Sequence, residues 1–213
     1  MPGPKRDTPG STRERILDAA AKTVARHGVG AATTKRIAAA AKVSEGSLYN
    51  HFADKSQLLI ALVLERLPSI RDIFTELARG PDGAALSERL SAAMVALIDF
   101  YGRAQPIVGG VLSDPKLLEL SRKRFIDTDE GPHRAHEKLT GFLKSEQQSG
   151  RLRKEVSAEV IASVLIGACT EFAVITQLTG RTPGDLDKQE YARALIATLS
   201  PALFPPSEKR PAR

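Results

Sequence analysis

The residues best suited to chemistry lie close together in the segment SEGSLYNHF, at residues 44–52. Helical spacing puts Leu48 and Phe52 one turn apart, on the face that the protein would bury. The opposite face then carries short or hydrogen-bonding groups, and Gly46 permits close approach of another molecule. A helix of this kind fits the major groove of B-DNA, where its first residues reach base edges. The exposed candidates for base contact are Glu45, Gly46, Ser47, Tyr49 and Asn50.

Two short helices and the start of a third must position this surface. Thr33 can cap the first short helix and Ser44 the second, since both side chains accept hydrogen bonds from free backbone N–H groups. The small residues Ala38 and Ala41 allow the two helices to cross closely. Lys55 falls at the start of the following helix and adds positive charge to a helix N-terminus, which is a good site for phosphate.

Positive charge is concentrated in the same part of the chain. Residues 1–60 contain ten Lys or Arg against five Asp or Glu, whereas the other 153 residues contain 21 against 20. A local excess of this sort is expected of a module that binds a polyanion. It is equally expected of a basic disordered arm on a neutral protein, so charge alone does not decide between them.

The composition is that of an ordinary globular protein, with 42% hydrophobic and 26% charged residues. The single cysteine, Cys169, excludes an intrachain disulfide and fits a reducing cytosol. Apolar runs are interrupted well short of 18 residues and the basic N-terminus has no apolar segment behind it, so we expect neither a membrane span nor a secretory signal. These features predict a cytoplasmic protein.

The whole chain after residue 10 predicts helices and no strands, because apolar residues recur at helical spacing and none alternate with period two for long. The expected fold class is therefore all-α. The first helix follows a capping box at Ser11 and Glu14, and Gly28 and Gly30 stop it. The later helices are expected at 54–79 with a kink at Pro68, at 87–101, after Asp114-Pro115, at 132–149, at 157–178 and at 187–203.

The segment 33–59 resembles the DNA-binding domain of the tetracycline-repressor (TetR) family. The resemblance covers about residues 12–72 and implies a helix-turn-helix at about 34–53, followed by a ligand-binding and dimerisation domain at 73–204. The ends, 1–11 and 205–213, are expected to be disordered. One position departs from the pattern, because Lys42 stands where the family has glycine in the turn. The matching residues are Thr34, Ile37-Ala38, Ala41, Val43-Ser44, Gly46-Ser47, Leu48-Tyr49, His51-Phe52, Lys55 and Leu58-Leu59.

The resemblance also implies roles for single residues. Thr34 and Lys35 would approach the DNA backbone and the groove edge, and Ser47 and Asn50 would face the bases. Tyr49, His51 and Lys55 would hold phosphates, although Tyr49 and His51 could instead pack against neighbouring helices. The full set of candidate DNA-binding residues is Thr34, Lys35, Ser44, Gly46, Ser47, Tyr49, Asn50, His51 and Lys55.

The last two helices carry broad apolar stripes that match the four-helix interface by which the family dimerises, or that form internal core. The candidate interface residues are Ile161, Leu165, Ala168, Phe172, Leu195 and Leu199. A small-molecule pocket among the middle helices would be lined by residues that also suit plain core, namely Met94, Tyr101, Phe125, His136 and Phe172.

The resemblance implies a homodimeric transcriptional repressor that binds a palindromic DNA operator and is released from it by a small molecule. No catalytic constellation or cofactor motif is present, so we expect neither an enzyme nor a cofactor. His133 and His136 lie one helical turn apart without a further ligand at suitable spacing, which favours solvated histidines over a metal site. The alternatives are a non-specific architectural DNA binder, and a helical small-molecule-binding protein or enzyme.

Overall fold

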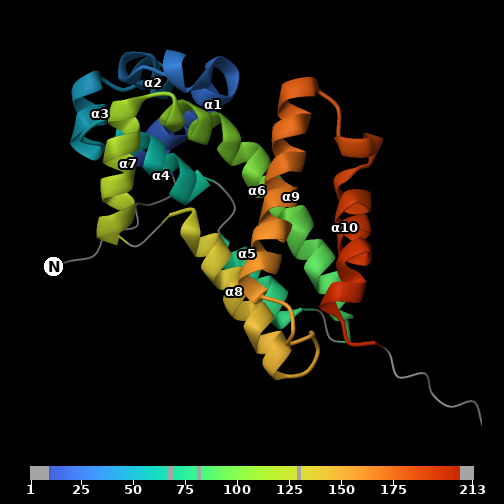
Figure 1. The fold of residues 1–213 in the computed structure, drawn as a ribbon. Coiled ribbons are helices and arrows are strands. Elements are labelled where there is room, and N and C mark those ends of the chain that lie inside the picture. Colours follow the sequence, from blue (N-terminus) through green and yellow to red (C-terminus); the bar gives the residue numbers. More distant parts are fainter. Residues whose placement is uncertain (1–9, 67–69, 81–82, 129–130, 207–213) are drawn as a thin grey trace, which may run out of the picture. The chain divides into compact units, whose positions relative to one another are not determined.

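The structure of this chain, a computed structural model, describes residues 10–66, 70–80, 83–128 and 131–206. Every regular element within those ranges is helical, which confirms the all-α fold class (Figure 1). The elements are α1 (Thr12–Ala31), α2 (Thr34–Ala41), α3 (Glu45–His51), α4 (Lys55–Arg66), α5 (Ile70–Arg79), α6 (Leu86–Leu112), α7 (Pro115–Thr128), α8 (His133–Gln148), α9 (Ala158–Thr179), the short 3₁₀ helix η1 (Pro183–Asp185) and α10 (Lys188–Leu203).

Local capping explains where most of these helices begin. The side chains of Ser11, Thr33, Ser44 and Ser157 each accept a hydrogen bond from a backbone N–H in the first turn of the helix that follows. Asp187 forms a full capping box at the start of α10. Each bond satisfies a donor that has no partner inside the helix. The starts expected at these polar residues are therefore confirmed.

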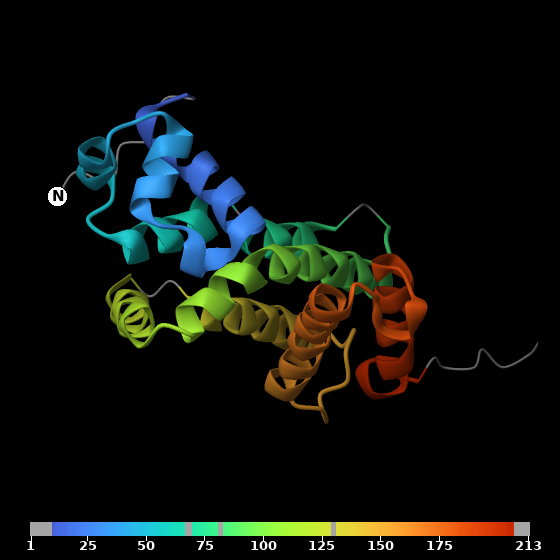
Figure 2. The ribbon, with the colours of Figure 1, turned by 90° about the horizontal axis from the view of Figure 1, so that it is seen from above.

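Three helices differ from the sequence-based expectation. Helix α1 extends to Ala31, beyond the end expected at Gly28. Gly28 nevertheless has a non-helical φ of 74°, which interrupts the regular helix. Helix α6 extends past Tyr101 to Leu112, through Pro106, and Figure 2 shows it in green as one continuous helix. The helix expected over 54–79 is instead described as α4 and α5. The expected kink at Pro68 lies outside the described residues, as do most residues of the two ends expected to be disordered.

The helices form two compact units. The described residues before 70 group with 103–128, and residues 70–102 group with those from 131 onward. In the first unit α1, α2, α3 and α4 enclose one apolar core, to which Ile107 of α6 and Leu117 of α7 also contribute. The C-terminal end of α6 therefore packs with the N-terminal helices, and so does α7. The domain division predicted from sequence instead assigns all of 73–204 to one domain. That division concerns function and stays a prediction.

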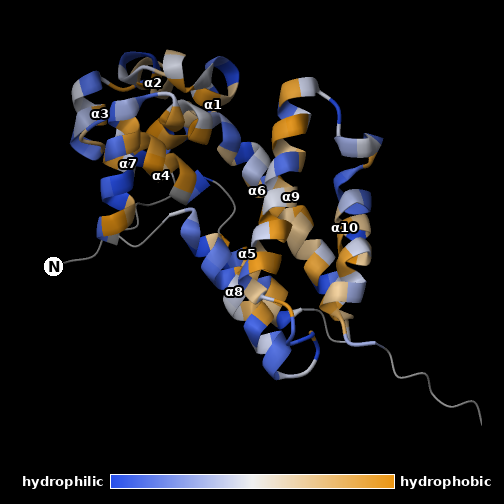
Figure 3. Cartoon of the chain, in the orientation of Figure 1, coloured by the Kyte–Doolittle hydropathy of each residue, from blue (hydrophilic) through white to orange (hydrophobic). Residues whose placement is uncertain are grey.

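The second unit is built around α9. Leu165 and Cys169 of this helix are buried in a core that also takes residues from α5, α6, α8 and α10. Helix α9 is long and apolar enough to cross a membrane by length and composition, which the expectation of short apolar runs did not anticipate. A helix in a protein core can have the same length and apolar composition, and the buried side of α9 is part of the core here. Figure 3 shows the apolar residues of α9 in orange.

Helices α8 and α9 are joined by an ion pair that should make stability depend on pH. Glu159 lies 2.6 Å from Lys144 and accepts a hydrogen bond of 2.8 Å from Ser157. Together these contacts lower the pKa of the Glu159 carboxyl from 4.5 to about 2, with the Lys144 bond as the larger cause. Because the folded pKa is the lower one, the stabilisation is present above the unfolded pKa and is lost as the pH falls through the folded pKa.

We therefore expect Glu159→Gln to lower the free energy of unfolding at neutral pH, and the difference from the parent protein to shrink between pH 4.5 and about 2. Urea denaturation at a series of pH values in low salt measures this difference, which is small because both side chains are exposed. Glu119→Gln, at an exposed position of α7, is the control. A difference that stayed constant down to pH 2 would contradict this assignment.

Candidate nucleic-acid interface

Helix α3 is held in the first unit by two apolar side chains. Leu48 and Phe52 are buried in its core, as the sequence predicts. Because these two occupy one face of a two-turn helix, the other face is left to solvent. Gly46, Asn50 and His51 are exposed on it, and Tyr49 is 48% exposed. The helix thus presents one continuous surface of small and hydrogen-bonding groups.

The start of α3 is shaped for close approach. The Ser44 hydroxyl accepts the Ser47 N–H at 3.0 Å, which fixes the first turn. A Cβ atom built on Gly46 would meet nothing nearer than the Ser44 oxygen at 3.8 Å. Internal packing therefore does not require glycine at this position. Its small size instead leaves room for a surface brought against the helix from outside.

The Tyr49 hydroxyl links α3 to the start of α2. It lies 3.2 Å from the Thr34 hydroxyl, so these two predicted contact residues form one hydrogen-bonded pair. Lys35 beside them is exposed. Lys55 is partly buried, and its ammonium donates to the backbone oxygen of Val29 at 2.6 Å. An ammonium has three donors, so this bond leaves it able to contact a phosphate as well.

The turn between α2 and α3 is left-handed at its first residue. Lys42 has φ 56° and ψ 47°, the conformation for which the TetR pattern supplies glycine. The Lys42 N–H donates to the Ala39 oxygen at 3.1 Å, and the Val43 N–H donates to the Ala38 oxygen at 3.0 Å. These two bonds close the end of α2 in the way that a left-handed glycine commonly does at a helix C-terminus.

Two arginines of α1 contact the motif, and neither is among the site residues predicted from sequence. The Arg13 guanidinium lies 5.0 Å from the centre of the Phe52 ring and donates to Glu65 of α4 at 2.6 Å. Arg15 donates to the backbone oxygens of Ala41 and Lys42. Their partners are distant in sequence, so no local pattern could have indicated them.

All six predicted interface residues are buried or partly buried within a single protomer. Leu165 and Phe172 are buried within a single chain, and the Ala168 backbone oxygen accepts the Tyr191 hydroxyl of α10 at 3.4 Å. Ile161, Leu195 and Leu199 are partly buried against the same core. The predicted stripe therefore lies largely between α9 and the rest of its own unit. The exposed apolar side chains of α9 are instead Val160, Val164 and Leu178.

Of the five predicted pocket residues, Met94 and Phe172 lie in the core of the second unit and Tyr101 packs against it. Met94 accepts from the Cys169 thiol at 3.6 Å, Phe172 is buried, and burial raises the pKa of Tyr101 to about 12. His136 is bonded to Ser163 at 3.0 Å, whereas Phe125 belongs to α7 in the first unit. Four of the five predicted residues thus belong to the second unit and Phe125 to the first.

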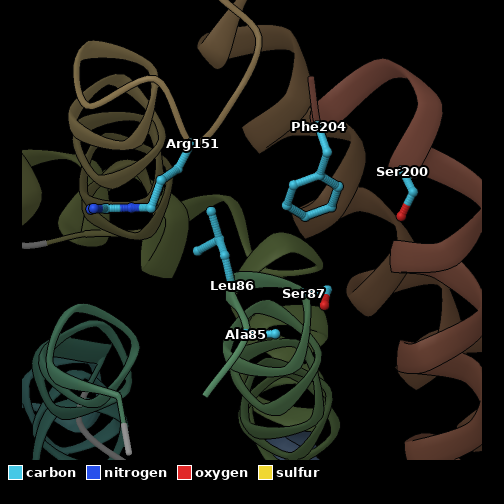
Figure 4. Close-up of a pocket in the computed structure, with 6 residues that line it drawn as sticks. All are labelled: Ala85, Leu86, Ser87, Arg151, Ser200 and Phe204. Carbon is cyan, nitrogen blue, oxygen red and sulfur yellow. The ribbon is translucent and has the colours of Figure 1, made fainter. Parts of the chain in front are cut away.

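Two surface hollows of the second unit lie elsewhere. In the first, Leu86 lies between Arg151 and Phe204, and the Arg151 side chain extends away from Phe204 (Figure 4). Its guanidinium is bonded to the Glu146 carboxylate at 3.0 Å. The second hollow lies between α6 and α10. Within the described ranges, no group of three or more His, Cys, Asp or Glu side chains is placed to hold a metal.

Comparison with known proteins gives one consistent result. The family model described as "Bacterial regulatory proteins, tetR family" matches residues 16–62. The chain is 37% identical over 195 residues to the HTH-type transcriptional repressor Rv1474c of Mycobacterium tuberculosis, a match that covers 92% of this chain and 95% of that protein. It is 34% identical over 70 residues to the repressor AcnR of Corynebacterium glutamicum, which covers 33% of this chain and only 37% of that repressor. A putative TetR-family regulator from Mesorhizobium loti has a similar structure, with a TM-score of 0.71, 16% identity and coverage of 91% of this chain and 97% of that chain.

The cap of α3 can be tested without DNA. We expect Ser44→Ala to lower the free energy of unfolding by about 1 kcal/mol, because the Ser47 N–H then has no partner in the protein. Ser44→Asn, which can supply an equivalent acceptor, should stay close to the parent. Urea denaturation followed by circular dichroism measures both. Equal stability of the alanine variant and the parent would show that this cap does not hold α3.

Proposed function

This chain belongs to the TetR family of bacterial regulatory proteins, and from that premise we propose that it represses transcription by occupying a DNA operator as a homodimer. It is a DNA-binding transcriptional regulator, as its named relatives are. In the proposed complex each protomer lays α3 into a major groove, and a two-fold axis sets half-sites one or more helical turns apart. A regulator of this kind works on the chromosome, so we place it in the cytoplasm.

The exposed face of α3 is the observation that carries the proposal. It offers hydrogen-bonding groups at Ser47 and Asn50 and a glycine at the point of closest approach. Lys35 and Lys55 lie at the starts of the adjoining helices, where positive charge and free N–H groups suit phosphates. Base-edge and phosphate contacts are thus assigned to different side chains. An architectural binder would need only the second kind.

That division predicts two classes of variant. Tyr49→Phe and Lys55→Ala should weaken binding by a similar factor on every DNA sequence, because phosphate contacts carry no sequence information. Asn50→Ala and Ser47→Ala should change the preferred base, by about 1–3 kcal/mol for a good bidentate contact. Fluorescence anisotropy with operator and scrambled duplexes at fixed salt measures both effects.

Lys138→Ala, at an exposed position of α8 in the other unit, is the control and should bind like the parent. If all four interface variants are folded and bind operator as the parent does, the interface is wrongly assigned. If the parent itself prefers operator to bulk DNA only weakly, the architectural alternative is favoured.

We further infer that protomers pair through the exposed side of α9 together with α10. Val160, Val164 and Leu178 follow the same side of α9, and Gly167 between them allows a second helix to approach closely. Apolar side chains aligned on an unburied helix face are typical of a surface that another chain covers. We thus keep the prediction that the helix pair α9 and α10 forms the dimer interface. Leu165 and Phe172 are assigned instead to packing inside the protomer.

Charge substitutions distinguish the two sides of α9. Val164, which is 45% exposed, should tolerate Glu in a monomer, so Val164→Glu is expected to give a folded monomer. Leu165→Glu places an unpaired charge in the core and should unfold the protein instead. Gln148→Glu, an exposed position on α8, is the control. Light scattering and circular dichroism at micromolar concentration report both properties, and a folded monomeric parent would refute the dimer.

We also propose that a small, partly apolar molecule lowers operator affinity by binding in the second unit. The core around Met94, Tyr101 and Phe172 supports this, because it combines a flexible thioether and aromatic rings with one partly buried phenol. A ligand changes DNA affinity only as far as its own affinity differs between the free and DNA-bound states. The effect is therefore reciprocal.

Reciprocity provides the test. Compounds that raise the melting temperature in a metabolite library should be titrated with and without operator duplex. An effector must bind the DNA complex less tightly, by the same factor by which it weakens operator binding. Hits that all bind both forms equally, or a library without hits, would contradict the proposal and favour a solid core.

A further inference from the structure

The end of α2 requires two kinds of support. Lys42 adopts a left-handed conformation that brings its Cβ close to the following carbonyl. This conformation costs glycine nothing, costs Asn and Asp little, and is unfavourable for other residues. In addition, the last carbonyls of a helix have no partner inside the helix. An external donor that binds those carbonyls could meet both needs.

Arg15 of α1 is such a donor. One of its terminal nitrogens donates to the Ala41 oxygen at 3.0 Å and to the Lys42 oxygen at 3.1 Å. The first oxygen belongs to the peptide before the Lys42 Cα and the second to the peptide after it. Their relative direction is therefore set by φ and ψ of Lys42, and a single nitrogen reaches both only when these angles have suitable values. The positive charge also suits a helix C-terminus.

We propose that Arg15 is a positioning residue for DNA recognition, which holds Lys42 in the left-handed conformation and thereby sets the direction of α3. Helix α3 begins only three residues after Lys42, so a change in this turn reorients its exposed face. The proposal rests on the function proposed above for α3. It assigns to α1 a part in specificity, through a side chain that need not touch DNA.

The test removes the backbone strain at the turn in a second way, by changing Lys42 itself. Arg15→Ala should weaken operator binding about tenfold, which corresponds to about 1.4 kcal/mol, and should weaken binding to scrambled DNA much less. Adding Lys42→Gly should restore operator affinity, because glycine adopts the left-handed conformation without the support of Arg15. Adding Lys42→Ala instead should not restore it. Both second changes remove the same charge, so only the backbone conformation distinguishes them.

The alternatives give different results. If Arg15 simply contacts a phosphate, neither second change restores binding and the slope of log affinity against log salt falls by about one unit, which would overturn the proposal. If Arg15→Ala does not fold while Arg15→Ala with Lys42→Gly does, the proposal is supported. If neither folds, Arg15 serves something other than the turn, and the proposal fails.

Thermal unfolding separates this failure from failure of the proposed function. Lys42→Gly should give a higher melting temperature than Lys42→Ala. This difference should be larger in the Arg15→Ala background than in the parent, whether or not DNA binds. A gain that is the same in both backgrounds would contradict the clamp even if the operator assay succeeded. A parent protein that binds no operator would contradict the proposed function. The coupling between Arg15 and Lys42 could then still be measured by thermal unfolding alone.

Discussion

The left-handed backbone at Lys42 is the constraint from which the geometry of the DNA-binding motif follows. It ends α2 at Ala41, and Ser44 then starts α3 in a new direction after only a short turn. Leu48 and Phe52 reach the core only if α3 leaves in that direction. The same direction places the polar face of α3 outward. A turn of a different shape would expose the two apolar anchors and withdraw the surface that we assign to DNA.

The rest of the first unit supplies a frame around this turn. Arg66 near the end of α4 donates to the Asp18 carboxylate at 2.8 Å and so ties α4 to α1. At the other end of α4, Lys55 is bonded to Val29. Side chains from α1 and α4 thus fix the helices on either side of the motif, while the residues assigned to DNA stay on the surface. Residues on the exposed face of α3 can therefore be substituted without loss of the fold.

Features that depend on neighbouring residues were predictable from the sequence. The caps at Ser44 and Asp187 and the buried anchors of α3 follow from local hydrogen bonding and helical spacing. Features that depend on distant partners were not. Helix α6 passes through Pro106 because the buried residues Ala104 and Ile107 on either side hold it in the core. The apolar stripe of α9 shows that a face will be buried, but not whether the cover is the same chain or a partner. Arg15 acts on carbonyls 26 and 27 residues away.

The central claim is that α3 reads base edges in the major groove, and methylation of guanine N7 by dimethyl sulfate tests it most directly. This atom lies in the major groove, so a helix placed there protects it. The account predicts protection in two segments of the operator, separated by one or more helical turns, that Asn50→Ala reduces at particular guanines. Binding that leaves every N7 as reactive as in free DNA, or protection without a repeat along the duplex, would contradict it.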